Sequence, residues 1–125
     1  MSETITRGVC ISVETNFLDE ESNEHQYVFS YHITISNEGE ETVQLMSRHW
    51  IITDANNHVE EVKGPGVIGY QPVLKPGESF DYTSYCPLKT PVGTMHGSFQ
   101  MVTDRGEGFD ALITPFRLSL PHMVH

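Results

Sequence analysis

The sequence has few cysteines and no long apolar run, and both shortages exclude classes of protein. Its two cysteines, Cys10 and Cys86, form no CxxC pair, which argues against a disulfide scaffold or a cysteine-rich zinc site. No stretch approaches the roughly 18 apolar residues of a membrane helix. The first eight residues contain an acid and lack the apolar segment of a signal peptide. We therefore expect a cytoplasmic protein with reduced thiols and no membrane partner, whereas a Cys10–Cys86 disulfide would require an oxidising compartment.

Basic residues are also scarce. Seven Lys and Arg stand against 17 Asp and Glu, so the formal net charge is −10. This charge repels phosphate backbones, and we expect no nucleic-acid partner. With 125 residues, of which 38% are hydrophobic, the chain is large enough to bury a core of its own. We expect one domain over residues 1–125, and nothing in its composition indicates a cofactor.

Helical periodicity is almost absent, and alternation with a period of two predominates. Residues 27–35 show it best, because large apolar side chains occupy every second position: Tyr27, Phe29, Tyr31, Ile33 and Ile35. Six further strands are predicted at 8–14, 42–53, 58–63, 78–86, 94–103 and 109–118. We expect a bulge near Ser47, and an edge position for the strand that contains Pro115. About seven strands predict an all-β, two-sheet antiparallel sandwich, immunoglobulin-like or fibronectin type III-like, with a closed barrel as the alternative.

Several motifs in the middle of the chain carry a family resemblance. They are WIITD at 50–54, VEEV at 59–62, GPGVIGYQP at 64–72, LKPGE at 74–78 and TPVG at 90–93. In order and spacing they resemble the ApaG family over nearly the whole chain. The resemblance implies a fibronectin type III-like sandwich and a bacterial protein linked, under the alternative name CorD, to cobalt resistance and magnesium efflux. Related domains accompany F-box and polymerase-interacting regions in larger eukaryotic proteins, which implies protein binding, and the family supplies no established catalytic residue.

The segment 64–69 satisfies the pattern GxGxxG after a predicted strand. In a dinucleotide-binding fold these glycines open a helix whose N-terminus receives pyrophosphate. Pro72 and Pro76 leave no room for such a helix, so a Rossmann site is rejected. A looser phosphate- or nucleotide-binding loop remains as an alternative function. Its candidate residues are Lys63, Gly64, Gly66, Gly69 and Lys75. The competing interpretation is that the glycines permit tight turns while Val67 and Ile68 cap the core.

Divalent-metal binding is the third functional class, and its support is thin. The only local cluster among the seven histidines is His122 with His125 at the C-terminus. The acidic segment that begins at Asp19 starts like a calcium loop, but Glu24 stands where that loop requires glycine. We therefore name no metal site.

Catalysis finds little support either, because the chain has no GxSxG and no recognisable base near Cys86. Aromatic and apolar residues predicted near the surface favour protein binding instead. The predicted partner-binding patch comprises Val67, Ile68, Tyr70, Tyr85 and Leu88, unless these residues close the ends of the sandwich. Exposed sheet edges would also allow a homodimer. The sequence thus predicts a non-enzymatic protein-interaction module whose partner is unknown.

Overall fold

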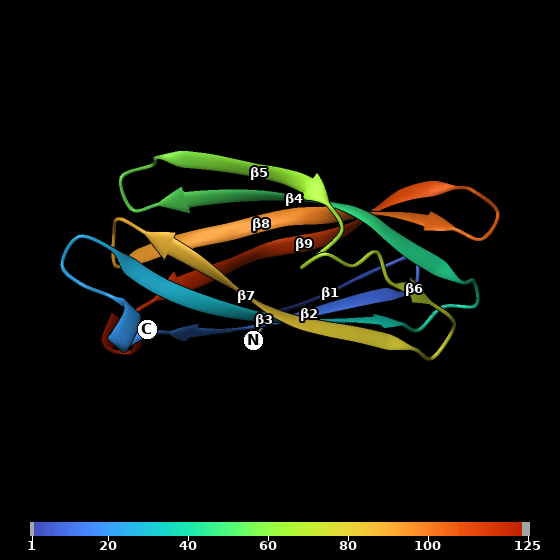
Figure 1. Ribbon diagram of the computed structural model, residues 1–125, viewed down its shortest axis with the longest axis horizontal. Helices are drawn as coiled ribbons and strands as arrows, with labels where there is room; N and C mark the ends of the chain where they lie inside the picture. Colours follow the sequence, from blue (N-terminus) through green and yellow to red (C-terminus); the bar gives the residue numbers. More distant parts are fainter. Residues whose placement is uncertain (1, 124–125) are drawn as a thin grey trace.

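The computed structural model describes residues 2–123, which form two antiparallel sheets packed face to face (Figure 1). The first sheet has the strand order β1-β2-β3-β7, and the second has the order β5-β4-β8-β9, with β6 paired to β4. The strands are β1 (Ser2–Thr6), β2 (Val9–Phe17), β3 (Tyr27–Asn37), β4 (Val43–Asp54), β5 (Val59–Pro65), β6 (Val73–Leu74), β7 (Ser79–Leu88), β8 (Val92–Thr103) and β9 (Gly108–Ser119). Two short 3-10 helices, η1 (Asp19–Glu21) and η2 (Pro121–Met123), lie outside the sheets.

The predicted sandwich is confirmed, with nine strands in the described residues rather than seven. All seven predicted strands are present. The two additional strands, β1 and β6, lack the signal on which the prediction depended. β1 alternates hydroxyl residues with Glu3 and Ile5 and shows no apolar face, while β6 contains only two residues. Both strands are held by pairing to a longer neighbour, β1 to β2 and β6 to β4.

Trp50 lies at the centre of the core between the two sheets. Its ring centroid is 5.5 Å from that of Tyr31, 6.1 Å from that of Phe99 and 5.9 Å from that of Phe116, all in edge-to-face geometry. Such pairs are favourable beyond the area that they bury. The alternating residues of β3 supply the opposite wall, where Ile33 is fully buried.

The predicted bulge in β4 is confirmed, since the register with β8 shifts between Leu45 and Ser47. Leu45 and Trp50 both face inward although they are an odd number of residues apart, and one extra residue reconciles the two positions. β9 is an edge strand, as Pro115 predicted. A second irregularity, between Met95 and Gly97 opposite this proline, was not predicted.

The two open sides of the sandwich differ. Between β1 and β9, the hydroxyls of Thr4 and Thr114 lie 3.0 Å apart, and Thr6 Oγ1 accepts a hydrogen bond from the Leu112 amide at 3.2 Å. Among the described residues, no hydrogen bond joins β5 to β7 on the other side. One lateral side is therefore closed by threonines, while the other leaves two sheet edges unjoined.

Gly97 provides a test of the close pairing between β8 and β4. A Cβ atom at this position would overlap the carbonyl oxygen of His49, whereas one at Gly108 would approach only the Met101 carbonyl oxygen, at 3.9 Å. We expect Gly97→Ala to lower the free energy of unfolding by about 3 kcal/mol, because the backbone itself must move. Gly108→Ala is the matched control and should change it by less than about 0.5 kcal/mol in urea unfolding. Equal stabilities would contradict this register.

Candidate functional site

The segment predicted as a phosphate-binding loop forms a tight turn. The amides of Val67 and Tyr70 each donate to the other's carbonyl oxygen at 2.8 Å, and the two residues between them have positive φ, 42° at Ile68 and 84° at Gly69. Two consecutive positive φ values are typical of a type I′ turn. Glycine adopts this conformation readily, but for a β-branched residue such as Ile68 it is a genuine outlier.

The other two glycines make room for neighbouring atoms. A Cβ at Gly66 would overlap the Tyr70 carbonyl oxygen, and one at Gly64 would lie 2.9 Å from both terminal nitrogens of Arg48. Arg48 Nη1 donates at 3.0 Å to the carbonyl oxygens of Pro65 and Gly66. The tight-turn interpretation therefore accounts for Gly66, whereas Gly64 lies on β5 and makes room for the Arg48 side chain.

The anion-binding prediction stays untested, but the geometry shows what its residues contact. The amides of Gly66, Val67 and Tyr70 all donate to carbonyl oxygens of the chain. Lys63 Nζ lies 3.4 Å from Glu61, so a carboxylate already partners one candidate cation. The second lysine, at position 75, donates its backbone amide to the Glu78 side chain at 2.7 Å.

Only three of the five residues in the predicted partner-binding patch are exposed at the surface. Val67 and Leu88 are only 1% and 5% exposed and belong to the hydrophobic core. Ile68 and Tyr70 are exposed, as is Tyr85. Tyr85, however, is far from Tyr70. The Tyr70 ring contacts Phe80 of β7, and Tyr85 lies five residues further along the same strand, about 16 Å from Phe80. It therefore belongs to a different part of the surface.

Two exposed residues that the sequence analysis missed, Met46 and Val73, adjoin the turn. We call Met46, Ile68, Tyr70 and Val73 the loop patch. Gln71 holds it together, since its Nε2 donates to the Met46 carbonyl oxygen at 2.9 Å and its own carbonyl oxygen accepts from Gln44 at 3.1 Å. Because the predicted bulge turns Met46 outward, its exposure could have been inferred from the sequence.

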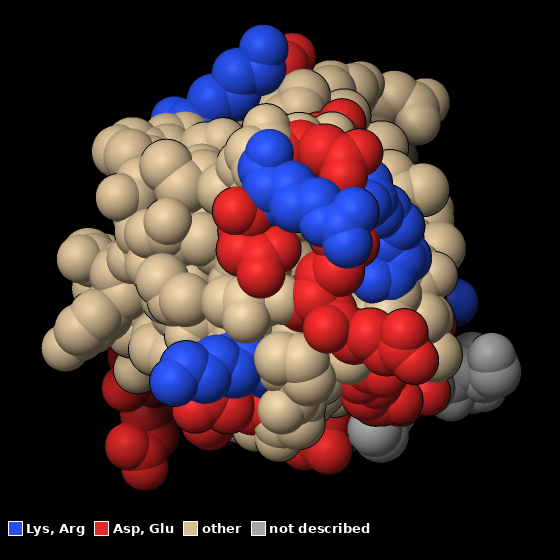
Figure 2. Space-filling model, turned by 90° about the vertical axis from the view of Figure 1, so that its right-hand side faces the viewer, with Lys and Arg blue, Asp and Glu red and all other residues tan. Residues whose placement is uncertain are grey.

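The loop patch comes from segments without acidic residues in a chain of net charge −10. No Asp or Glu occurs between Glu41 and Asp54 or between Glu61 and Glu78. Figure 2 shows the end of the sandwich near β6, where charged side chains of both signs interleave beside a broad uncharged area. One ion pair of the chain joins Arg7 Nη2 to Glu41 Oε1 at 3.2 Å.

A second feature is a groove on the open side of the sandwich between β5 and β7, which we call the edge groove. Its two adjoining parts have volumes of about 260 and 310 Å³ and share Ile52, Glu60 and Pro87. The inner part is lined by Tyr31, Arg48, Trp50 and Val62 together with Ser84 to Pro87 of β7. The sequence analysis did not single out Arg48. It lies two residues before Trp50 on β4, so both side chains are on the inward face of the strand.

Two buried polar atoms beside the edge groove have no hydrogen-bond partner among the described residues, namely Trp50 Nε1 and the Tyr82 hydroxyl. Burial raises the pKa of Tyr82 well above its usual value, and the nearby Tyr31 raises it further, whereas Arg48 lowers it. The hydroxyl therefore stays protonated at any physiological pH. Unpaired buried polar groups of this kind are uncommon, and each calls for an explanation.

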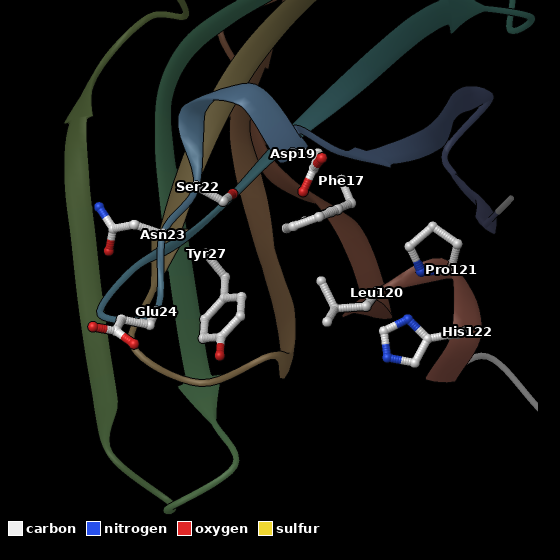
Figure 3. Close-up of a pocket in the computed structure, with 9 residues that line it drawn as sticks. All are labelled: Phe17, Asp19, Ser22, Asn23, Glu24, Tyr27, Leu120, Pro121 and His122. Atoms are coloured by element: carbon white, nitrogen blue, oxygen red, sulfur yellow. The ribbon is translucent and has the colours of Figure 1, made fainter.

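A third hollow, of about 360 Å³, lies where the acidic segment meets η2 (Figure 3). Phe17, Tyr27 and Leu120 form its apolar part. Asp19 and Glu24 stand well apart on its walls in Figure 3, so these two carboxylates do not converge on one point. The Ser22 hydroxyl is occupied within the loop, because it donates to the Leu18 carbonyl oxygen at 2.7 Å.

Metal ligands do not gather in the described residues, which contain no group of three His, Cys, Asp or Glu side chains suited to an ion. His49 Nε2 lies 2.7 Å from Glu61 alone. His32 contacts Asp81 at 3.1 Å and the Thr83 hydroxyl at 2.8 Å on the solvent-facing side of the first sheet. Of the predicted C-terminal cluster, His125 lies outside the described residues.

The chain shares both sequence and fold with known proteins. A family model described as the ApaG domain matches residues 18–103. Protein ApaG of Anaeromyxobacter dehalogenans is 51% identical over 121 residues, 97% of either chain, and that of Acidithiobacillus ferrooxidans is 56% identical over 117 residues, 92% of either chain. The crystal structure of the putative ApaA protein from Bordetella pertussis is 46% identical, with a TM-score of 0.90 over 92% of this chain and 95% of that one.

Neither thiol is suited to nucleophilic chemistry. Both cysteines are free and buried, and burial raises the pKa of Cys86 to about 12 and also raises that of Cys10. At pH 8 the thiolate fraction of Cys86 should be roughly a thousandfold below that of an exposed cysteine. We expect a disulfide reagent to label Cys86 only after unfolding, with urea-unfolded protein as the control. Rapid labelling of Cys86 in the folded protein would contradict this environment.

The unpaired hydroxyl of Tyr82 makes a prediction about stability. Tyr82→Phe removes a buried polar group that lacks a partner, so we expect the free energy of unfolding to rise by about 1 kcal/mol. Tyr31→Phe is the matched control, because the Tyr31 hydroxyl is not among the buried polar atoms that lack a partner, and its removal should not raise the free energy of unfolding. Urea unfolding measures both values, and a loss of stability in Tyr82→Phe would show that its hydroxyl is already satisfied.

Proposed function

Because the chain belongs to the ApaG domain family, we propose that it is a non-enzymatic module of the cytoplasm that binds a protein partner through the loop patch. Exposed apolar side chains gathered in one place are a usual mark of a partner-binding surface. The patch combines an aromatic residue and a methionine, two residue types that are enriched at protein interfaces.

The observation that carries the proposal is the conformation of Ile68. A β-branched residue at φ 42° costs on the order of 1–3 kcal/mol. The side chain is 54% exposed, so the fold recovers little of this cost through burial. Asparagine or glycine would suit the turn better. An apolar side chain held in an unfavourable conformation at the surface is well explained by contact with a partner.

Rigidity supports the same conclusion. The turn that displays Ile68 is closed by two backbone hydrogen bonds, and the chain on either side is tied to β4 through Gly66 and Gln71. A surface already held in one conformation loses less entropy when it binds. The loop patch is therefore prepared for contact with a partner.

The link to cobalt resistance and magnesium efflux that the resemblance implies would, on this proposal, be an indirect one. No metal-ligating group of three side chains occurs in residues 2–123. In the same part of the chain, no helix is both long and apolar enough to cross a membrane. We propose that any effect on divalent cations is exerted through the bound partner, with the chain itself carrying no ion.

The test is Ile68→Asn, which should increase stability while it weakens binding. Asparagine tolerates positive φ, so we expect the free energy of unfolding to rise by about 1 kcal/mol. Loss of the apolar side chain should release the partner that wild-type protein captures from the native cell, as measured by quantitative mass spectrometry and then with the purified partner.

Val59→Asn is the matched control for this experiment. Val59 is also β-branched and is 58% exposed, but it lies at the other end of β5, six residues and about 20 Å before Pro65. It should retain the captured protein. If Ile68→Asn and Val59→Asn capture the same proteins as wild type, the loop patch is not the binding surface.

A further inference from the structure

The edge groove is a second candidate binding site, separate from the loop patch. It lies where β5 and β7 face each other without a hydrogen bond between them in the described residues, while the opposite side of the sandwich is closed by threonines. Strands at the edge of a sheet present unpaired backbone amides and carbonyls. The groove thus has backbone hydrogen-bonding groups on both walls and the aromatic core as its floor.

Trp50 supplies the first sign of a ligand. Its side chain is 97% buried by accessible area, since only 3% remains exposed, yet it lines the groove and its Nε1–H finds no acceptor among the described residues. An indole nitrogen can only donate a hydrogen bond. A partner for this group must therefore be an acceptor atom.

Arg48 supplies the second sign. Both hydrogen bonds that it makes to the described chain come from Nη1, and they fix the guanidinium over Gly64 at the side of the groove. A guanidinium is always charged and presents its donors in a planar fork that matches a carboxylate. The unpaired hydroxyl of Tyr82 belongs to the core next to Tyr31 and Arg48, behind the groove-lining residues, and is also a potential donor. These three side chains present donors and a single positive charge.

We propose that the edge groove binds a carboxylate side chain carried on an extended segment of a partner protein, with the carboxylate between Arg48 and Trp50. The charge of Arg48 complements the carboxylate. Glu60 is exposed and lines both parts of the groove with the opposite charge, so the partner's carboxylate is placed on the Arg48 side. An extended segment can pair with the free edge of β7, as in strand addition. From Ser84 to Lys89 the groove extends about 17 Å, enough for five or six residues.

A second copy of the chain is a poorer occupant. Pairing of two β5 edges would bring Glu60 and Glu61 of both copies together, and like charges facing across strands are destabilising. Self-association through β5 is therefore disfavoured by charge, whereas a partner segment with one acidic residue at its centre can place that residue against Arg48.

Trp50 is the only tryptophan, so its indole N–H signal in nitrogen–proton NMR reports on the groove without ambiguity. The probe is a capped five-residue peptide, Thr-Val-Glu-Val-Thr, titrated into the full chain, and the matched control has Gln in place of Glu. We expect the Glu peptide to move the Trp50 signal and to bind at least tenfold more tightly than the Gln peptide. Arg48→Gln should abolish this preference, and Val59→Thr should leave it unchanged.

Since Arg48 also holds the glycine turn, Tyr82→Phe provides an independent variant that keeps the turn intact and should weaken the Glu peptide several-fold. The proposal is wrong if the Glu peptide does not move the Trp50 signal at millimolar concentration, or if the Gln peptide binds equally well. It is also wrong if capped glutamate alone binds as tightly as the peptide, or if the signal depends only on protein concentration, which would indicate self-association. None of these results depends on Ile68, so the proposal that the loop patch binds a partner is tested independently of the edge groove.

Discussion

The packing of Trp50 between the two sheets is the constraint on which the other features depend. Its edge-to-face contacts with Tyr31, Phe99 and Phe116 require it to face inward, and Leu45 on the same strand must face inward as well. Strand alternation cannot satisfy both positions without one additional residue. At the bulge that results, Met46 is exposed. Beyond it, the side chain of Arg48 lies on the same inward face of β4 as that of Trp50. A single packing requirement therefore places a methionine on the surface and an arginine at the margin of the core.

An arginine at the margin of a core needs partners for its donors, and this need accounts for the neighbouring sequence. Gly64 lies opposite Arg48 in the register with β5, and the absence of a side chain there leaves space for the guanidinium. The carbonyl oxygens of Pro65 and Gly66 accept its Nη1 hydrogen bonds. The glycine pattern that resembles a nucleotide-binding loop in sequence is thus explained largely by an arginine on the adjacent strand. Glycines occur where backbone or side-chain atoms come close to the chain, and several kinds of neighbour can require the same glycine pattern.

The alternation of apolar residues predicted most of the fold, because each long strand has one face in a shared core. It could not predict β1, whose Thr4 and Thr6 close one side of the sandwich through hydroxyls and bury no apolar face. The site was less predictable. Val67 and Leu88 were assigned to the surface because the direction of a side chain in a turn or near the end of a strand depends on contacts that the sequence does not display. The groove was missed for a similar reason: its donors come from β4 and β7, which meet only across the core.

The loop patch and the edge groove are physically connected. The ring of Tyr70 lies 5.8 Å from that of Phe80, which lies 6.4 Å from that of Tyr82, so a continuous row of aromatic side chains runs from the exposed turn to the unpaired hydroxyl beside the groove. Arg48 joins the same two regions by polar contacts, since it holds the turn through Nη1 and lines the groove. A substitution at Arg48 therefore disturbs both surfaces, whereas changes at Ile68 or at the Tyr82 hydroxyl each affect one. This arrangement makes the two surfaces experimentally separable even though the fold positions them with the same side chain.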